Sequence, residues 1–522
     1  MIETANINPT HLQDVIVEKQ LRDMRDQFIQ SIRADDIRRL AASYHPSQSD
    51  GEFFQDPIRG SYNICYFIRF PQPPSSSLAS SPDLWDKWVV RVPLTPYLPF
   101  GADKKLEGEI AAMELVSAKT SIPLPNVIAY AINEKSKPFP TFMILEFVEG
   151  KKLSHKAYQE FMPEQRLQFY ASLADIFIQL RRLEFDAIGR LLRREDGSFT
   201  VSSPIATMDL NAQALEGLQP SQVLARHSGG GPLQSAGKYV DMLHDLADNA
   251  FAKSRSSVLE GDSIGEEYLY HLHSFREHVK DWRAENDDQG PFVLVHGDFQ
   301  PFNLLVDDQG SIVSVLDWEW SRVVPRQFFK PPLWLQYADL TLLSRSLFYD
   351  RFLKTLQDFL GVVRQRELEK YGNTMLADEW NGARERQGFL VANALESWTH
   401  VDWLMHNQGD SEGLEERIRE FMGRDPRRVD LVARKVRDGE AYKVDIQRLA
   451  RARCVHTTGW LPAGLSKLSS QVCQSVAAWE RRLCMTGLTP GLVILFICGG
   501  GFIIGFSRPW RWLHRTYSRF YQ

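Results

Sequence analysis

Cysteine is scarce in this sequence, and neither sign of charge dominates it. The chain has 522 residues and 5 cysteines, which are too few and too scattered for a disulfide framework, so we expect a reducing compartment. The formal net charge is −5, which argues against a dedicated nucleic-acid binder. The N-terminus has no apolar run behind a basic start, so we expect no secretory signal peptide.

Long uncharged apolar runs are also absent, with one exception near the C-terminus. Residues 483–507 carry no charged side chain, and arginines flank them on both sides. As a helix, residues 488–506 would be roughly 28 Å long, close to the thickness of a bilayer core. We therefore predict a membrane-associated tail helix, either a single-span anchor or a shallow hairpin. A buried core helix is the alternative.

The remaining pattern predicts two unequal lobes behind a helical extension. Residues 62–70, 88–92, 126–133 and 141–148 are typical of strands, and 104–119 of a helix, which together predict a small antiparallel sheet carrying one helix. Helical patterns then dominate, apart from short strands at 292–296, 303–307 and 312–316. The expected parts are a helical extension at 1–49, a small lobe at 50–148, a helical lobe at 149–423, a basic linker at 424–482, the apolar segment at 483–507 and a basic aromatic tail at 508–522.

The strongest motif is HGDFQPFNLLVDDQGSIVSVLDWEW at residues 296–320. A strand delivers Asp298 to a loop, Asn303 follows five residues later, and the next hairpin presents Asp317 beside them. Phosphoryl transfer from ATP requires this mixture of groups. One carboxylate receives the proton of the acceptor hydroxyl, while an amide oxygen and a second carboxylate hold Mg²⁺ against the phosphates.

This motif resembles the catalytic loop of aminoglycoside phosphotransferases and choline-kinase-like enzymes, the fungal-type phosphotransferase enzyme family included. These enzymes are similar to protein kinases in their H-R-D-x-x-x-x-N pattern. The resemblance implies an α+β, two-lobed protein-kinase-like fold. It also implies that Asp298 is the catalytic base, that Asn303 and Asp317 are metal ligands, and that His296 supports the loop.

Upstream residues match the nucleotide-binding half of the same pattern. The resemblance implies that Arg91 stands where the family has its phosphate-binding lysine, and that Glu109 is the partner glutamate. Gly60 and Ser61 lie where a turn covers the phosphates, although the full G-x-G-x-x-G is absent. Backbone groups at Glu146, Phe147 and Val148 would meet adenine at the hinge between the lobes.

Several protein-kinase features are missing. Asp317-Trp318-Glu319 replaces D-F-G, Gly297 replaces the arginine of H-R-D, and no A-P-E follows. The basic residue that would receive an activation-loop phosphate is therefore absent, and a small-molecule acceptor fits better than a protein.

We expect an ATP- and Mg²⁺-dependent kinase that phosphorylates a hydroxyl of an unidentified small molecule, with its catalytic domain in the cytosol. Two alternatives remain. One is a catalytically weak or inactive pseudokinase-like ATP-binding scaffold at a membrane, which Arg91 and the reduced glycine turn favour. The other is a lipid-headgroup kinase acting on choline or ethanolamine, which an apolar tail would favour.

Overall fold

The computed structural model describes residues 12–71, 85–202, 205–284, 288–385, 387–408, 412–458, 493–498 and 501–506. Residues 1–443 and 444–522 form two compact units. The first unit holds both predicted lobes. The Pro/Ser-rich connection between the first two predicted strands lies outside the described residues.

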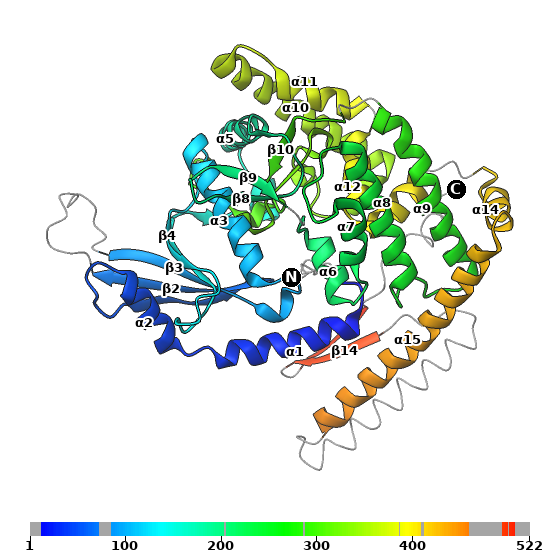
Figure 1. Cartoon of the computed structure of the whole chain (residues 1–522), viewed down its shortest axis with the longest axis horizontal. Helices are drawn as coiled ribbons and strands as arrows, with labels where there is room; N and C mark the ends of the chain where they lie inside the picture. The colour runs from blue at the N-terminus through cyan, green and yellow to red at the C-terminus, as the bar shows by residue number, and fades with distance from the viewer. Residues whose placement is uncertain are drawn as a thin grey trace. The chain divides into compact units, whose positions relative to one another are not determined.

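A five-stranded antiparallel sheet builds the small lobe (Figure 1). Its strands run in the order β1-β2-β3-β5-β4. Their bounds are β1 Glu52–Arg59, β2 Asn63–Pro71, β3 Trp85–Pro93, β4 Val127–Ala131 and β5 Phe142–Glu146. Four of these strands were predicted. The first was missed because Pro57 interrupts its pattern, and a proline is tolerated here because β1 is an edge strand.

The alternation of side chains along β5 explains how helices cover both faces of this sheet. Phe142 and Ile144 belong to a core shared with helix α2 (Ala34–Tyr44). Met143 and Leu145 point to the opposite face and join the core that contains helix α3 (Ala102–Lys119). Successive side chains of a strand point to opposite faces, so one short apolar run serves two cores.

The predicted N-terminal helix is in fact two helices, α1 (Val15–Ser31) and α2. Asp14 caps α1 by accepting the amides of Ile16 and Val17, and it also pairs with Arg255 of the large lobe at 2.6 Å. Farther along α1, Arg25 lies over the ring of Tyr97 in the small lobe. The extension therefore bridges the two lobes, which the sequence pattern did not indicate.

The large lobe is mostly helical, as predicted. Its helices are α4 His155–Gln159, α5 Pro163–Arg181, α6 Met208–Leu215, α7 Pro220–Ser228, α8 Ala236–Lys253, α9 Asp262–Ala284, α10 Ser346–Tyr371, α11 Met375–Glu385, α12 Gly388–Leu395, α13 Trp398–Gln408 and α14 Leu414–Gly423. The predicted short strands are β10 Phe292–Val295, β11 Leu304–Val306 and β12 Ile312–Val315. Five more short strands were not predicted: β6 Lys151–Lys152, β7 Glu184–Phe185, β8 Arg190–Arg193, β9 Phe199–Ser202 and β13 Arg322–Pro325.

The prediction of a C-terminal tail helix is wrong. Residues 493–498 and 501–506 are strands, β14 (Val493–Cys498) and β15 (Gly501–Phe506), which pair with each other antiparallel. β-Branched and aromatic residues favour strands. Among the described residues, no helix combines the length and apolarity needed to cross a bilayer.

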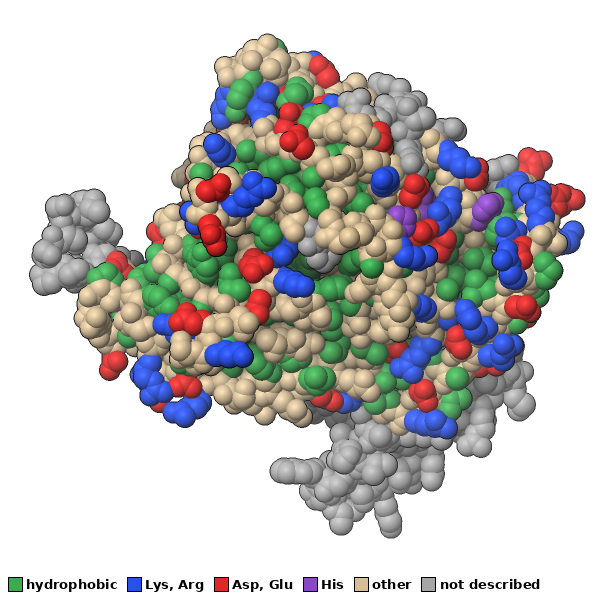
Figure 2. Space-filling model, in the orientation of Figure 1, with side chains coloured by type: hydrophobic (Ala, Val, Ile, Leu, Met, Phe, Trp, Pro, Cys, Tyr) green, Lys and Arg blue, Asp and Glu red, His purple; other side chains and the backbone are tan. Residues whose placement is uncertain are grey.

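The basic segment begins with a long helix, α15 (Pro426–Thr458). Residues 459–492 and the basic aromatic tail at 508–522 lie outside the described residues. On the face seen in Figure 2, positive and negative side chains are interspersed, as the small net charge leads one to expect. The predicted domain boundaries and membrane association remain predictions.

Candidate active site

His296 anchors the loop that follows β10. Its ring is buried, its Nε2 donates to the carbonyl of Leu316 at 2.9 Å, and its Nδ1 accepts the amide of Asp298 at 3.4 Å. Burial lowers the pKa of His296 to about 4, against the opposing effect of the bond to Leu316. The imidazole is therefore neutral at physiological pH and acts as a brace between Asp298 and the segment before Asp317.

Gly297 explains why this loop cannot keep the arginine of H-R-D. Its backbone has φ +84°, and a Cβ placed there would lie 2.1 Å from the carbonyl oxygen of Trp320. No side chain fits at that distance. Glycine lets the segment 317–320 approach the catalytic loop closely.

Asp298 and Asn303 are joined directly. The Asn303 side-chain amide donates both to the Asp298 carbonyl oxygen at 2.9 Å and to its Oδ2 at 3.1 Å. Burial, together with the carboxylates of Asp317 and Glu319, raises the pKa of Asp298 to about 7. Because Asn303 uses its nitrogen toward Asp298, its Oδ1 is oriented away from that carboxylate.

Asp317 is brought beside Asn303 by the backbone. The amide of Leu316 donates to the Asn303 carbonyl at 2.8 Å, and Asp317 then turns the chain with φ +65°, a conformation that aspartate tolerates better than most residues. An amide oxygen and a carboxylate from neighbouring segments are hard ligands that fit Mg²⁺. The described residues contain no group of three or more His, Cys, Asp and Glu arranged for a metal, but magnesium bound with a nucleotide needs only one or two protein ligands.

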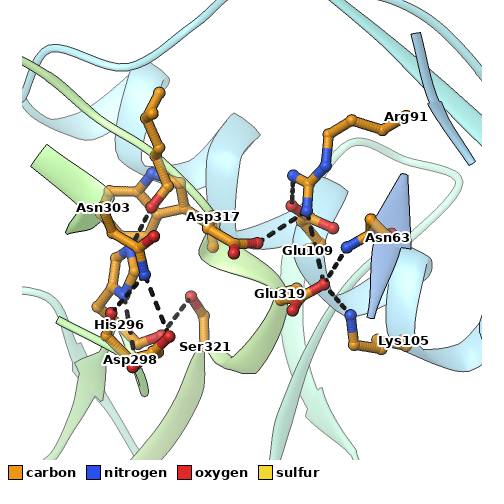
Figure 3. A network of polar contacts seen from close by, with 12 residues as sticks. Asn63, Arg91, Lys105, Glu109, His296, Asp298, Asn303, Asp317, Glu319 and Ser321 are labelled. Carbon is orange, nitrogen blue, oxygen red and sulfur yellow. Dashed lines mark hydrogen bonds and ion pairs between the residues drawn. The ribbon is translucent and has the colours of Figure 1, made fainter. Parts of the chain in front are cut away.

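Arg91 of β3 connects this loop to the small lobe (Figure 3). Its guanidinium lies 2.5 Å from Glu109, 2.7 Å from Asp317 and 3.5 Å from Glu319. Burial alone would lower the pKa of Arg91, but Glu109 and Asp317 raise it well above its usual value. Burial likewise opposes ionisation of Asp317, yet Arg91 and Lys105 lower its pKa. The predicted pair of Arg91 and Glu109 is present.

Three residues of this network were not predicted: Asn63, Lys105 and Glu319. Glu319 is buried, and it accepts from the Asn63 side chain and pairs with Lys105 of α3. One signal was available for Lys105, because it precedes Glu109 by four residues and so lies on the same face of the helix. Nothing local marks Asn63 or Glu319, since their partnership depends on how the two lobes meet.

The predicted phosphate turn lies at the tip of the β1–β2 hairpin, where the amide of Gly60 donates to the Asn63 carbonyl at 2.8 Å. No described contact links Gly60 or Ser61 to Asp317.

At the predicted hinge, the amides of Glu146 and Phe147 donate to the carbonyls of Asn126 and Lys87, each at 2.9 Å. These two donors are therefore used within the lobe. Among the described backbone bonds none uses the Val148 amide, so of these three amides it is the one not engaged within the lobe.

A model of the phosphotransferase enzyme family matches residues 79–328. This range contains Arg91, Glu109 and the whole motif from His296 to Trp320. Among curated proteins, clavilactone A biosynthesis cluster protein Y of Ampulloclitocybe clavipes is 22% identical over 286 residues, which cover 51% of this chain and 64% of that protein. The chain thus spans somewhat less than two thirds of this relative.

Solved structures of similar chains include the GDP complex of wild-type aminoglycoside 2'-phosphotransferase-IIIa, which is 13% identical with a TM-score of 0.36. The match covers 76% of this chain and 93% of that one. A thermostable mutant of aminoglycoside phosphotransferase APH(4)-Ia, in ternary complex with AMP-PNP and hygromycin B, is 13% identical with a TM-score of 0.35. There the coverage is 70% of this chain and 95% of the other.

Proposed function

Residues 79–328 match a model of the phosphotransferase enzyme family, and from this match we propose that the chain transfers the γ-phosphoryl group of ATP to a hydroxyl of a small molecule. The observation that carries the proposal is the meeting of three oxygen-bearing side chains. Asp298, Asn303 and Asp317 come from two segments of the large lobe, and Arg91 of the small lobe contacts the last of them.

In the proposed reaction, Asp298 accepts the proton of the acceptor hydroxyl. The hydroxyl oxygen forms a bond to the γ-phosphorus, the bond from that phosphorus to the β–γ bridging oxygen breaks, and ADP leaves. A raised pKa near 7 suits a group that takes a proton at neutral pH. Asn303 orients the carboxylate through its donated hydrogen bond.

Asn303 and Asp317 would hold Mg²⁺, which would neutralise charge on the phosphates. Arg91 would contact the phosphates while Glu109 keeps its guanidinium in place. The Val148 backbone would meet adenine. Because the reaction would use ATP, we also propose that it takes place in the cytosol.

The test is nucleotide turnover with Mg-ATP across a panel of hydroxylated metabolites, choline and ethanolamine included. We expect Asp298→Ala to lower turnover by about 10²- to 10⁴-fold, because it removes the general base. Asp308→Asn is the matched control, since this exposed carboxylate in the same hairpin only pairs with Lys151 on the surface. Equal turnover by wild type and Asp298→Ala would overturn the proposal.

One observation favours the second candidate, a weak or inactive pseudokinase-like ATP-binding scaffold. Arg91 contacts Asp317 itself, so a metal ion has to compete with a guanidinium for that carboxylate. Thermal unfolding with ATP, with and without Mg²⁺, separates the two candidates. An active kinase is stabilised more by ATP when Mg²⁺ is present, whereas a scaffold that has lost the metal site gains nothing from Mg²⁺.

A further inference from the structure

The end of the β1–β2 turn is fastened to the segment that follows Asp317. Asn63 donates to the buried carboxylate of Glu319, and the ring of Tyr62 meets the ring of Trp320 edge-on, with centroids 4.9 Å apart. Two consecutive residues of the turn thus contact two residues of the Asp-Trp-Glu-Trp segment. The part of the small lobe expected to cover the phosphates is therefore tied to the part of the large lobe expected to hold the metal.

Lys105 completes this connection. Its ammonium pairs with Glu319 and lies 4.9 Å from the centroid of the Trp320 ring and 5.4 Å from that of Tyr62. The side chains of Lys105 and Glu319 are only 9% and 3% exposed. A buried ion pair contributes little net stability, because desolvation offsets the attraction between the charges, but it restricts the geometry of its partners. We call Asn63, Lys105 and Glu319 the interlobe cluster.

The N-terminal helix supports the interlobe cluster from outside. Leu21 of α1 shares a buried apolar group with Tyr62, Tyr97 and Trp320. The two rings that flank the Lys105 ammonium are therefore held in a packed environment.

The interlobe cluster also acts on Arg91. One nitrogen of the Arg91 guanidinium lies 2.7 Å from Asp317 and 3.5 Å from Glu319. If Asp317 held a metal ion, the metal would share this carboxylate with Arg91, which contacts its Oδ1, and would weaken the attraction between the two side chains. Glu109 accepts from the other guanidinium nitrogen, and Glu319 is the second acceptor in reach of this one, so Arg91 would keep its partners while a metal ion competes for Asp317.

We propose that Glu319, held by Asn63 and Lys105, is a positioning residue that retains Arg91 and sets the spacing between the phosphate turn and Asp317 when Mg-nucleotide binds. This inference rests on the proposed function of the site. Glu319 does not itself touch the nucleotide or the metal. Its effect falls on the part of the nucleotide affinity that depends on Mg²⁺.

The test is calorimetric titration of the full chain with AMP-PNP, with and without Mg²⁺, because the ratio of the two dissociation constants isolates the metal-dependent part. Glu319→Gln and Lys105→Met are each expected to reduce this ratio by about 10-fold, a usual size for coupling between two sites. Lys105→Arg keeps the charge and is expected to retain the ratio. Lys104→Met is the matched control, since Lys104 is the exposed neighbour on the same helix.

The outcomes separate this inference from the function on which it rests. A cluster that only stabilises the fold would lower the melting temperature and weaken both titrations alike, leaving the ratio unchanged, and that result overturns the inference alone. If wild type binds AMP-PNP with no gain from Mg²⁺, the metal site itself is wrong, and both the proposed function and the inference fail.

Discussion

The two halves of the candidate site are built in different ways. In the large-lobe half, Asn303 bonds to Asp298 over 5 residues of chain, and His296 bonds to Leu316 over 20. In the small-lobe half, Arg91 reaches Asp317 over 226 residues, and Asn63 reaches Glu319 over 256. The first half is a local structure that its own sequence can specify. The second exists only when the lobes are correctly docked.

The difference also concerns charge. The large-lobe half contains a neutral histidine and a carboxyl group whose pKa is raised to about 7. In the small-lobe half, two cations, Arg91 and Lys105, pair with Glu109 of the same lobe and with Asp317 and Glu319 of the large lobe. Removing one charged side chain should therefore lower the free energy of unfolding much more in the second half than in the first, because a buried charge without a partner destabilises the folded state.

The largest expected effect is the loss of Arg91. Arg91→Met leaves three carboxylates without their shared cation, so the free energy of unfolding should fall by about 3–5 kcal/mol in denaturant titration. Arg69→Met is the matched control in the neighbouring strand. Its arginine pairs with Glu52 at the surface, and the expected loss is below about 1 kcal/mol. Similar losses of unfolding free energy in the two variants would show that the buried network contributes no more to stability than a surface ion pair.

Next in size is a change in the local half. Gly297→Ala adds a methyl group 2.1 Å from the Trp320 carbonyl oxygen, at a backbone φ of +84°. Strain and crowding together should lower the free energy of unfolding by about 3 kcal/mol. Gly361→Ala, where a Cβ meets nothing within 4 Å inside helix α10, should be neutral or slightly stabilising. If Gly297→Ala left the free energy of unfolding unchanged, the catalytic loop and the segment 317–320 could not approach each other as closely as described.

The smallest expected effect concerns the start of helix α1, which bridges the two lobes. Glu216 of the large lobe accepts the amide of Asp14 at 3.0 Å at the start of α1, and burial raises the pKa of Glu216 from 4.5 to about 7, against the lowering effect of the amides of Gln13 and Asp14. The contribution of the protonated Glu216 carboxyl group to the free energy of unfolding is complete below about pH 4.5. It is lost as the pH rises through about 7.

Glu216→Gln removes this titration. The variant and wild type should have similar stability at pH 5 and differ on the order of 2 kcal/mol at pH 8, with the variant more stable. Urea denaturation across this pH range measures the difference. Parallel curves for the two proteins would show that the carboxyl group is not the source of the pH dependence.

The same contrast explains what the sequence could predict. The spacing of Asp298, Asn303 and Asp317 within one strand–loop–hairpin unit was readable because every contact is local. Four of the five sheet strands and the α3 helix followed from side-chain periodicity. Glu319 and Asn63 could not be paired from sequence, since their contact is a consequence of lobe docking.

Two other features show the limits of periodicity. The N-terminal segment was predicted as a helix, but its bridging role depends on Asp14 meeting Arg255 far along the chain. The apolar C-terminal segment was predicted as a helix from hydropathy alone. Its β-branched and aromatic residues favour the strands β14 and β15 instead.

The most direct test of the central claim is a crystal structure of the full chain with Mg-AMP-PNP. The account predicts Mg²⁺ bound by both the Asn303 amide oxygen and the Asp317 carboxylate, with Asp298 facing the γ-phosphate and Arg91 retained by Glu319. A nucleotide bound outside this site, or a metal ion that contacts neither Asn303 nor Asp317, would contradict it.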